Sequence, residues 1–183
     1  AQGYPTRPVR MIVAVPPGGP ADTLARLVGP HLNTALGQTV VIDNRPGGNY
    51  AVGAQAVARS PADGLTLLVA PDSTVTANPH LISKLPYDPV KDLTPIIVLC
   101  RITPVMVITP ALPVQNVQEL IALAKSRPGQ LNYAAGTIGA SPHLATELFK
   151  SMTGTDMVRI PYKGTGPSVI ALVGGEAHLM FTA

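Results

Sequence analysis

Three turns rich in glycine and proline each follow a short apolar run and precede a helical pattern of apolar residues. A buried strand, a tight turn and an amphipathic helix are the structures that such a succession predicts. Proline suits the first helical turn, where its missing N–H would have had no partner. The three turns are Pro16–Pro20 after the run Val9–Val15, Gly136–Pro142 after Leu131–Ala135, and Pro161–Pro167 after Met157–Ile160.

Turns of this kind are suited to binding an anion through the backbone. Glycine lets backbone N–H groups approach a ligand closely. The first N–H groups of a helix have no intrahelical acceptor and carry a partial positive charge. In open α/β sheets, ligands bind beyond the carboxyl ends of the strands. We therefore predict an anion site without a metal, in which the donors are the N–H groups of Gly18-Gly19, Gly136-Thr137 and Lys163-Gly164.

Side chains beside these turns extend the candidate site. Asp22 is in the first helical turn, where its negative charge would interact favourably with the helix dipole or its side chain would cap the helix. Alternatively, it could bind an amine of the ligand. Thr137 and Ser141 offer hydroxyl donors, and Ser141 also suits a helix N-cap. Lys163 could supply positive charge or stand in a solvated loop. The candidate ligand-binding residues are Pro17, Gly18, Gly19, Asp22, Ser73, Thr74, Gly136, Thr137, Ser141, His143, Tyr162, Lys163 and Gly164.

His143 and Glu147 are four residues apart on one expected helix and could suggest a metal pair. A metal site needs more ligands than this, and no third one is evident. We predict no metal, no cofactor and no catalytic residue, with His143 either an early-helix structural residue or a ligand contact.

The elements that position these residues suggest two α/β lobes. Strands are expected at 9–15, 38–43 and 65–70, with helices between them, and this βαβαβ order predicts a parallel sheet. A short helix capped by Asn78 follows, then a strand at 96–100 in which Cys100 is a buried apolar residue. A capping-box helix from Asn116 opens the second lobe. We place the first lobe at 1–102 and the second at 103–183.

Composition excludes several classes of protein. Of 183 residues, 46% are hydrophobic, which is enough for a sizeable core. Lys and Arg are scattered, and aromatic residues are only 4% of the chain, which argues against a nucleic-acid surface. No apolar run approaches the ~20 residues of a membrane helix. The sequence from Ala1 lacks a signal peptide, as in a cytosolic protein or in a secreted protein after cleavage.

A series of short motifs runs along the whole chain. The motifs are Tyr4–Arg10, Pro16–Asp22, Gly37-Gln38, Val40-Val41, Asn44–Gly47, Pro61–Gly64, Pro128–Tyr133, His143–Ala145, Glu147–Phe149 and Pro161–Gly164. Each motif is weak alone, but together and in this order they resemble the Bug, or TctC-like, periplasmic solute-binding proteins of tripartite tricarboxylate transporters.

The resemblance implies a type II periplasmic-binding-protein (Venus-flytrap) architecture, in which two α/β lobes enclose a cleft for a small carboxylate. Tricarboxylates, dicarboxylates, acidic amino acids or aromatic acids are the implied ligands, and the membrane subunits of the transporter are the implied partners. The mature, periplasmic form would have lost its signal peptide. Family members are longer, so we expect this chain to stop before the return to the first lobe.

Two other functions are compatible with anion-binding turns. A sensory domain would bind the same ligand and signal to a receptor, and gene context would distinguish it from a transport protein. An enzyme acting on a phosphorylated or acyl substrate is disfavoured, because the chain has no G-x-x-x-x-G-K-[ST] loop and no G-x-S-x-G elbow. We therefore expect a non-enzymatic binding protein.

Overall fold

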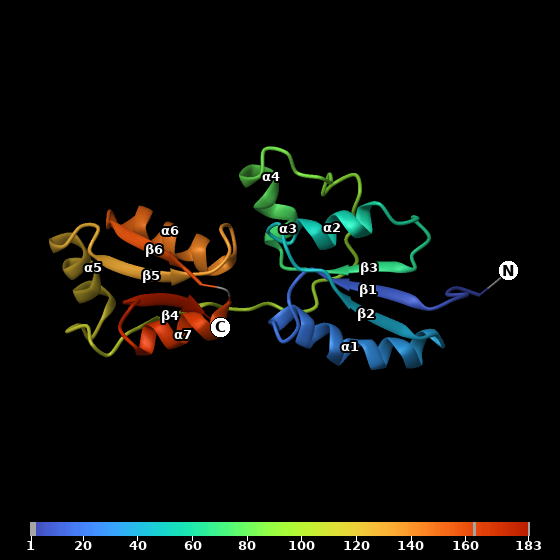
Figure 1. Ribbon diagram of the computed structural model, residues 1–183, viewed down its shortest axis with the longest axis horizontal. Coiled ribbons are helices and arrows are strands. Elements are labelled where there is room, and N and C mark those ends of the chain that lie inside the picture. The colour runs from blue at the N-terminus through green and yellow to red at the C-terminus, as the bar shows by residue number, and fades with distance from the viewer. Residues whose placement is uncertain (1–2, 163, 183) are drawn as a thin grey trace. The chain divides into compact units, whose positions relative to one another are not determined.

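A computed structural model of the protein describes residues 3–162 and 164–182. The chain forms two compact units, Ala1–Leu99 and Cys100–Ala183, each built from a sheet with helices on its faces (Figure 1). The boundary falls three residues before the one that we expected, which lay after residue 102.

The first unit contains a three-stranded parallel sheet, as the βαβαβ pattern predicted. Its strands are β1 (Val9–Val13), β2 (Val40–Asn44) and β3 (Thr66–Val69), and β1 lies in the centre of the order β2-β1-β3. All three strands end at the same edge, where Val13 is paired with Asn44 on one side and with Val69 on the other.

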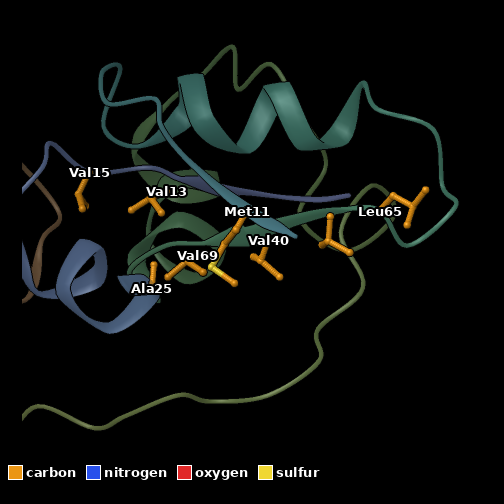
Figure 2. Close-up of a cluster of buried hydrophobic side chains, with 8 residues drawn as sticks. Met11, Val13, Val15, Ala25, Val40, Leu65 and Val69 are labelled. Carbon is orange, nitrogen blue, oxygen red and sulfur yellow. The ribbon is translucent and has the colours of Figure 1, made fainter. Parts of the chain in front are cut away.

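Helices cover both faces of this sheet. Helix α1 (Pro20–Leu36) packs on the face that carries Met11 and Val13, and Figure 2 shows these side chains with Ala25 of the helix in one buried cluster. Helix α2 (Ala51–Ala58) covers the opposite face, over Leu68. A parallel sheet covered on both faces has apolar residues at nearly every position of its central strand, which is why residues 9–15 are apolar except for Arg10.

Two short helices, α3 (Ser73–Thr76) and α4 (Asn78–Leu81), follow β3. The predicted cap at Asn78 is wrong, because Ala77 is the N-cap of α4. Asn78 is instead fully buried, and its Nδ2 donates to the carbonyl of Asn49 at 2.7 Å and to the Tyr87 hydroxyl at 3.2 Å.

The strand expected at 96–100 does not form. This stretch has no regular secondary structure, and Ile96, Ile97 and Val98 are each at least 70% exposed. A strand requires a partner for its backbone groups, and no described strand pairs with this segment. The expectation of a buried Cys100 is also wrong, because this cysteine is exposed.

The second unit contains a four-stranded sheet of mixed direction. Its strands are β4 (Val105–Ile108), β5 (Leu131–Ala135), β6 (Met157–Pro161) and β7 (Leu179–Thr182), in the order β4-β7-β5-β6. Only β4 runs antiparallel to its neighbour. The turns after β5 and β6 therefore lie at the same edge.

Three helices cover the second sheet. Helices α5 (Val117–Ser126) and α6 (Ser141–Thr153) contribute to a cluster around Tyr133, and helix α7 (Thr165–Val173) packs on Ala134, whose side chain points to the other face. Within residues 3–162 and 164–182, none of the helices combines the length and the apolar character needed to cross a membrane.

The predicted start of α5, similar to a capping box, is confirmed at Asn116, although the return bond from Glu119 reaches the N–H of Gln115 and not that of the N-cap residue. The Asn116 Oδ1 accepts the N–H of Glu119 at 2.9 Å, and the Glu119 Oε2 accepts the N–H of Gln115 at 2.8 Å. Replacing Asn116 with alanine should lower the free energy of unfolding by about 1 kcal/mol in urea denaturation. The exposed Gln118→Ala, inside the same helix, should change it little. A loss as large in the control would show that the cap is not responsible.

Candidate functional site

The turn between β1 and α1 has the sharp geometry that its glycines predicted. Gly18 has a φ of 83°, in the left-handed region that favours glycine, and Gly19 is the N-cap of α1. The Gly18 N–H donates to the Asp22 Oδ2 at 2.9 Å, and the Gly19 N–H donates to the Pro16 carbonyl at 3.4 Å. The Gly18 N–H is thus bound within its own turn and is not the free donor that we expected.

Asp22 joins this turn to the end of β2. Its side chain is buried and accepts hydrogen bonds from Arg26 Nε at 2.9 Å and from Asn44 Nδ2 at 2.8 Å, besides the Gly18 N–H. Hydrogen bonds from Arg26, Gly18 and Asn44 lower the pKa of Asp22 to about 2. The carboxylate therefore acts as an internal anchor of the turn.

Two N–H groups in the first turn of α1 have no preceding helical carbonyl to bind. They belong to Ala21 and Asp22, since Pro20 has no N–H and the Thr23 N–H already donates to the Gly19 carbonyl at 2.9 Å. These are the donors that the start of α1 can offer to an anion.

Ser73 and Thr74 follow the carboxyl end of β3, which is the strand that pairs with β1. Asp72 caps the short helix that contains them, by accepting the Ser73 N–H at 2.9 Å. Both residues are buried, and their hydroxyl oxygens, like the Asn49 Oδ1, have no hydrogen-bond partner among the described residues. Buried hydroxyl groups normally have a partner, so these oxygens are candidates for contact with a ligand or an ordered water.

The turn between β5 and α6 also contains a left-handed glycine. Gly139 has a φ of 81°, and its N–H donates to the Nδ1 of His143 at 3.2 Å. Ala140 is the N-cap of α6, so the expectation of a cap at Ser141 is wrong, and Ser141 is instead the first helical residue. The Ala140 N–H donates to the Thr137 carbonyl at 3.2 Å.

The structure brings the second and third glycine turns together. A Cβ atom on Gly136 would lie 3.2 Å from the carbonyl oxygen of Tyr162, so glycine permits this close approach. The N–H of Gly164 donates to the Tyr162 carbonyl at 3.0 Å, which makes it another internally bound donor. The Tyr162 hydroxyl lies 3.5 Å from Glu176 Oε2, and Lys163 is outside the described residues.

Two residues that the sequence did not propose for the site, Asn44 and Arg159, hold these turns in place, and Glu147 has a structural role that its spacing did not predict. Asn44 bridges Asp22 and the Val15 carbonyl, and Arg159 donates to the Gly136 carbonyl at 3.0 Å. Glu147 accepts from the Tyr133 hydroxyl at 2.6 Å and from Lys150 Nζ at 2.9 Å, and the Tyr133 hydrogen bond lowers its pKa. A charged or amide residue that pairs across the fold has no local sequence signal by which it could have been found.

Glu147 is therefore a structural hydrogen-bond acceptor for Tyr133 and Lys150. In residues 3–162 and 164–182, no group of three or more metal-ligating side chains comes together. What the turns can offer is a set of backbone and hydroxyl donors for an anion.

Comparison with known proteins gives the family. Residues 24–183 match the family described as the tripartite tricarboxylate transporter family receptor, TctC. The chain belongs to this family. It is 42% identical to the protein BugT of Bordetella pertussis over 176 residues, which are 96% of this chain and 54% of BugT. The chain thus spans about half the length of this relative.

Solved structures of the family are similar over nearly the whole chain. The R. palustris protein Rpa4515 with adipate is 40% identical, with a TM-score of 0.85, over 97% of this chain and 60% of that one. MatC from Rhodopseudomonas palustris with bound malate is 32% identical, with a TM-score of 0.83, over the same shares of the two chains. A structure described as a periplasmic transporter is 38% identical. The predicted family and the α/β fold of periplasmic binding proteins are confirmed.

Proposed function

We propose that this TctC-family protein is a non-enzymatic receptor that binds a small carboxylate outside the cytoplasm. The observation that carries the proposal is that two relatives, similar over 97% of this chain, hold the dicarboxylates adipate and malate. The ligand-binding turns in each unit lie at the carboxyl ends of parallel strands, where α/β proteins bind their ligands.

The contacts that we propose combine backbone and side-chain donors. In the first unit, they are the N–H groups of Ala21 and Asp22 with the hydroxyl groups of Ser73 and Thr74. In the second unit, the corresponding donors lie in the turn Gly136–Ser141 and at Tyr162. Pro17, Gly19 and Gly164 shape these turns. An anion held mostly by N–H and O–H groups needs no cofactor.

Isothermal titration calorimetry of the purified protein with adipate and malate tests this function. We expect saturable binding of at least one of the two acids at pH 7.5. Adipamide is the matched control, because it has the same carbon chain without the charges, and it should not bind. Equal binding of adipamide, or no binding of any di- or tricarboxylate by the folded protein, would contradict the proposal.

We further propose that the receptor delivers its ligand to the membrane subunits of a tripartite tricarboxylate transporter. Uptake of radiolabelled adipate or malate by cells that carry these subunits should require the receptor gene. Uptake that is unchanged by deletion of the gene, despite binding in vitro, would favour a sensory role.

A further inference from the structure

The turns that precede α1 and α6 have the same internal arrangement. In each, a glycine with a φ near 80° is followed by an N-cap residue in an extended conformation, Gly19 with a ψ of 164° and Ala140 with a ψ of 156°. In each, the N–H of the left-handed glycine donates to the side chain four residues later, which is Asp22 in one and His143 in the other. The two units therefore fix equivalent turns by equivalent hydrogen bonds.

The two acceptors differ in their response to pH. The Asp22 carboxylate accepts a hydrogen bond at any pH well above 2. The Nδ1 of His143 can accept the Gly139 N–H only in the neutral ring, whose proton must then be on Nε2. Protonation would place a second donor opposite the Gly139 N–H.

The surroundings of His143 favour the neutral ring. The side chain is half-buried, and this burial is the main reason that its pKa lies below the usual value. The charged groups that act on it are Glu147 and Lys150 from its own helix and Arg159 from β6, and the two cations oppose the one carboxylate.

We infer that His143 is a positioning residue, which holds the turn Gly136–Ala140 only while its ring is neutral and releases this turn when the ring is protonated. The consequence for ligand affinity rests on the proposed function. If the turn contributes donors to the ligand, their loss of order weakens binding, since donors must be preorganised to bind well. The equivalent turn in the first unit, held by Asp22, stays fixed over the same pH range.

The direction of the pH effect separates this role from direct contact. An imidazolium that touched the ligand would attract a carboxylate, and affinity would rise as the pH falls. If His143 only positions the turn, protonation breaks its hydrogen bond with Gly139, and the affinity falls as the pH falls. The variant His143→Asn separates the two further, because asparagine Oδ1 takes the place of Nδ1 as an acceptor and does not titrate.

The first test needs no ligand. In ¹⁵N-labelled protein, the amide signal of Gly139 should shift between pH 8 and 5.5 with the same midpoint as the ring of His143. The amide of Gly18 serves as the internal control and should not shift, and the Gly139 amide of His143→Asn should lose its pH dependence. A Gly139 amide that stays constant while the His143 ring titrates would overturn the inference.

The second test is the affinity for adipate at pH 7.5 and 6.0, by calorimetry. We expect the wild-type affinity to fall at pH 6.0 by an amount set by the fraction of His143 rings that the first test finds protonated at that pH, with about five-fold, the effect of one hydrogen bond lost from the turn, as the limit for a fully protonated ring. The ratio for His143→Asn should be close to one, whereas the exposed His31→Asn should keep the wild-type ratio. A rise in affinity at pH 6.0, absent from His143→Asn, would overturn the inference in favour of direct contact. If no dicarboxylate binds at either pH, the proposed function fails. The pH dependence of the Gly139 amide signal then tests the positioning role of His143 without any ligand.

Discussion

Replacing Asp22 with alanine should lower the free energy of unfolding of the first unit by about 3 kcal/mol, measured by urea denaturation. The carboxylate is buried and accepts from Gly18, Arg26 and Asn44, so its removal leaves the Gly18 N–H without its acceptor and the Asn44 amide with only the Val15 carbonyl. The turn that offers the first donors of α1 would lose its anchor.

Arg26→Ala is the matched control. It removes the other member of the same ion pair but leaves the Asp22 carboxylate with its hydrogen bonds from Gly18 and Asn44, and water can replace the Arg26 side chain, which is 54% exposed. We expect a loss below about 1 kcal/mol. Equal losses in the two variants would mean that the ion pair, and not the buried acceptor, stabilises the turn.

The low pKa of Asp22 predicts how the effect of its replacement depends on pH. A carboxyl whose pKa falls from 3.8 to about 2 on folding contributes stability above pH 3.8 that is lost as the pH falls toward 2. The difference between wild type and Asp22→Ala should therefore shrink by about 1 kcal/mol between pH 5 and pH 3. A difference that stays constant over this range would contradict the lowered pKa.

Replacing Gly53 with alanine should lower the free energy of unfolding by about 2 kcal/mol, although alanine is the better helix former. A Cβ atom on Gly53 would lie 2.8 Å from the Cβ and 2.9 Å from the Cα of Ala14, and 3.1 Å from the Arg45 carbonyl. These atoms belong to or adjoin the backbone of the sheet, so no side chain can rotate away. Helix α2 would have to move off β1.

Gly29→Ala provides the control, measured by the same denaturation. Gly29 is also buried in a helix, but its added Cβ would meet only the Ile42 side chain, at an ordinary distance of 3.5 Å. The gain in helix propensity should then leave stability unchanged or raise it by up to about 1 kcal/mol. If both variants lost the same free energy, close packing against Ala14 would not explain the effect.

The strand that we predicted at 96–100 does not form, which shows that residue types alone are not enough to predict a strand. Ile96, Ile97 and Val98 have high β propensity. This propensity reflects favourable packing within a sheet, and it does not make an isolated segment form a strand. Whether such a run forms a strand depends on a partner for its N–H and C=O groups. Pairing of this kind is a tertiary property, and here the described chain supplies none.

The sequence by itself determined what depends on neighbours along the chain. Glycine-rich turns, prolines at helix starts and the Asn116–Glu119 capping box are local, because their hydrogen bonds join residues within four positions. The nearly unbroken apolar run of β1 likewise specified the central strand, since a parallel sheet buries both of its faces. The same local motifs carried the resemblance to the family.

Only the tertiary structure decided which polar groups of these turns remain free. The bond from Gly18 to Asp22 and the bond from Gly164 to the Tyr162 carbonyl consume donors that the sequence had assigned to a ligand. Asn44 reaches Asp22, and Arg159 reaches Gly136, across strand pairs that bring residues 22 and 23 positions apart into contact. A buried polar group takes whichever partner the fold brings within reach, and that partner cannot be found from spacing along the chain.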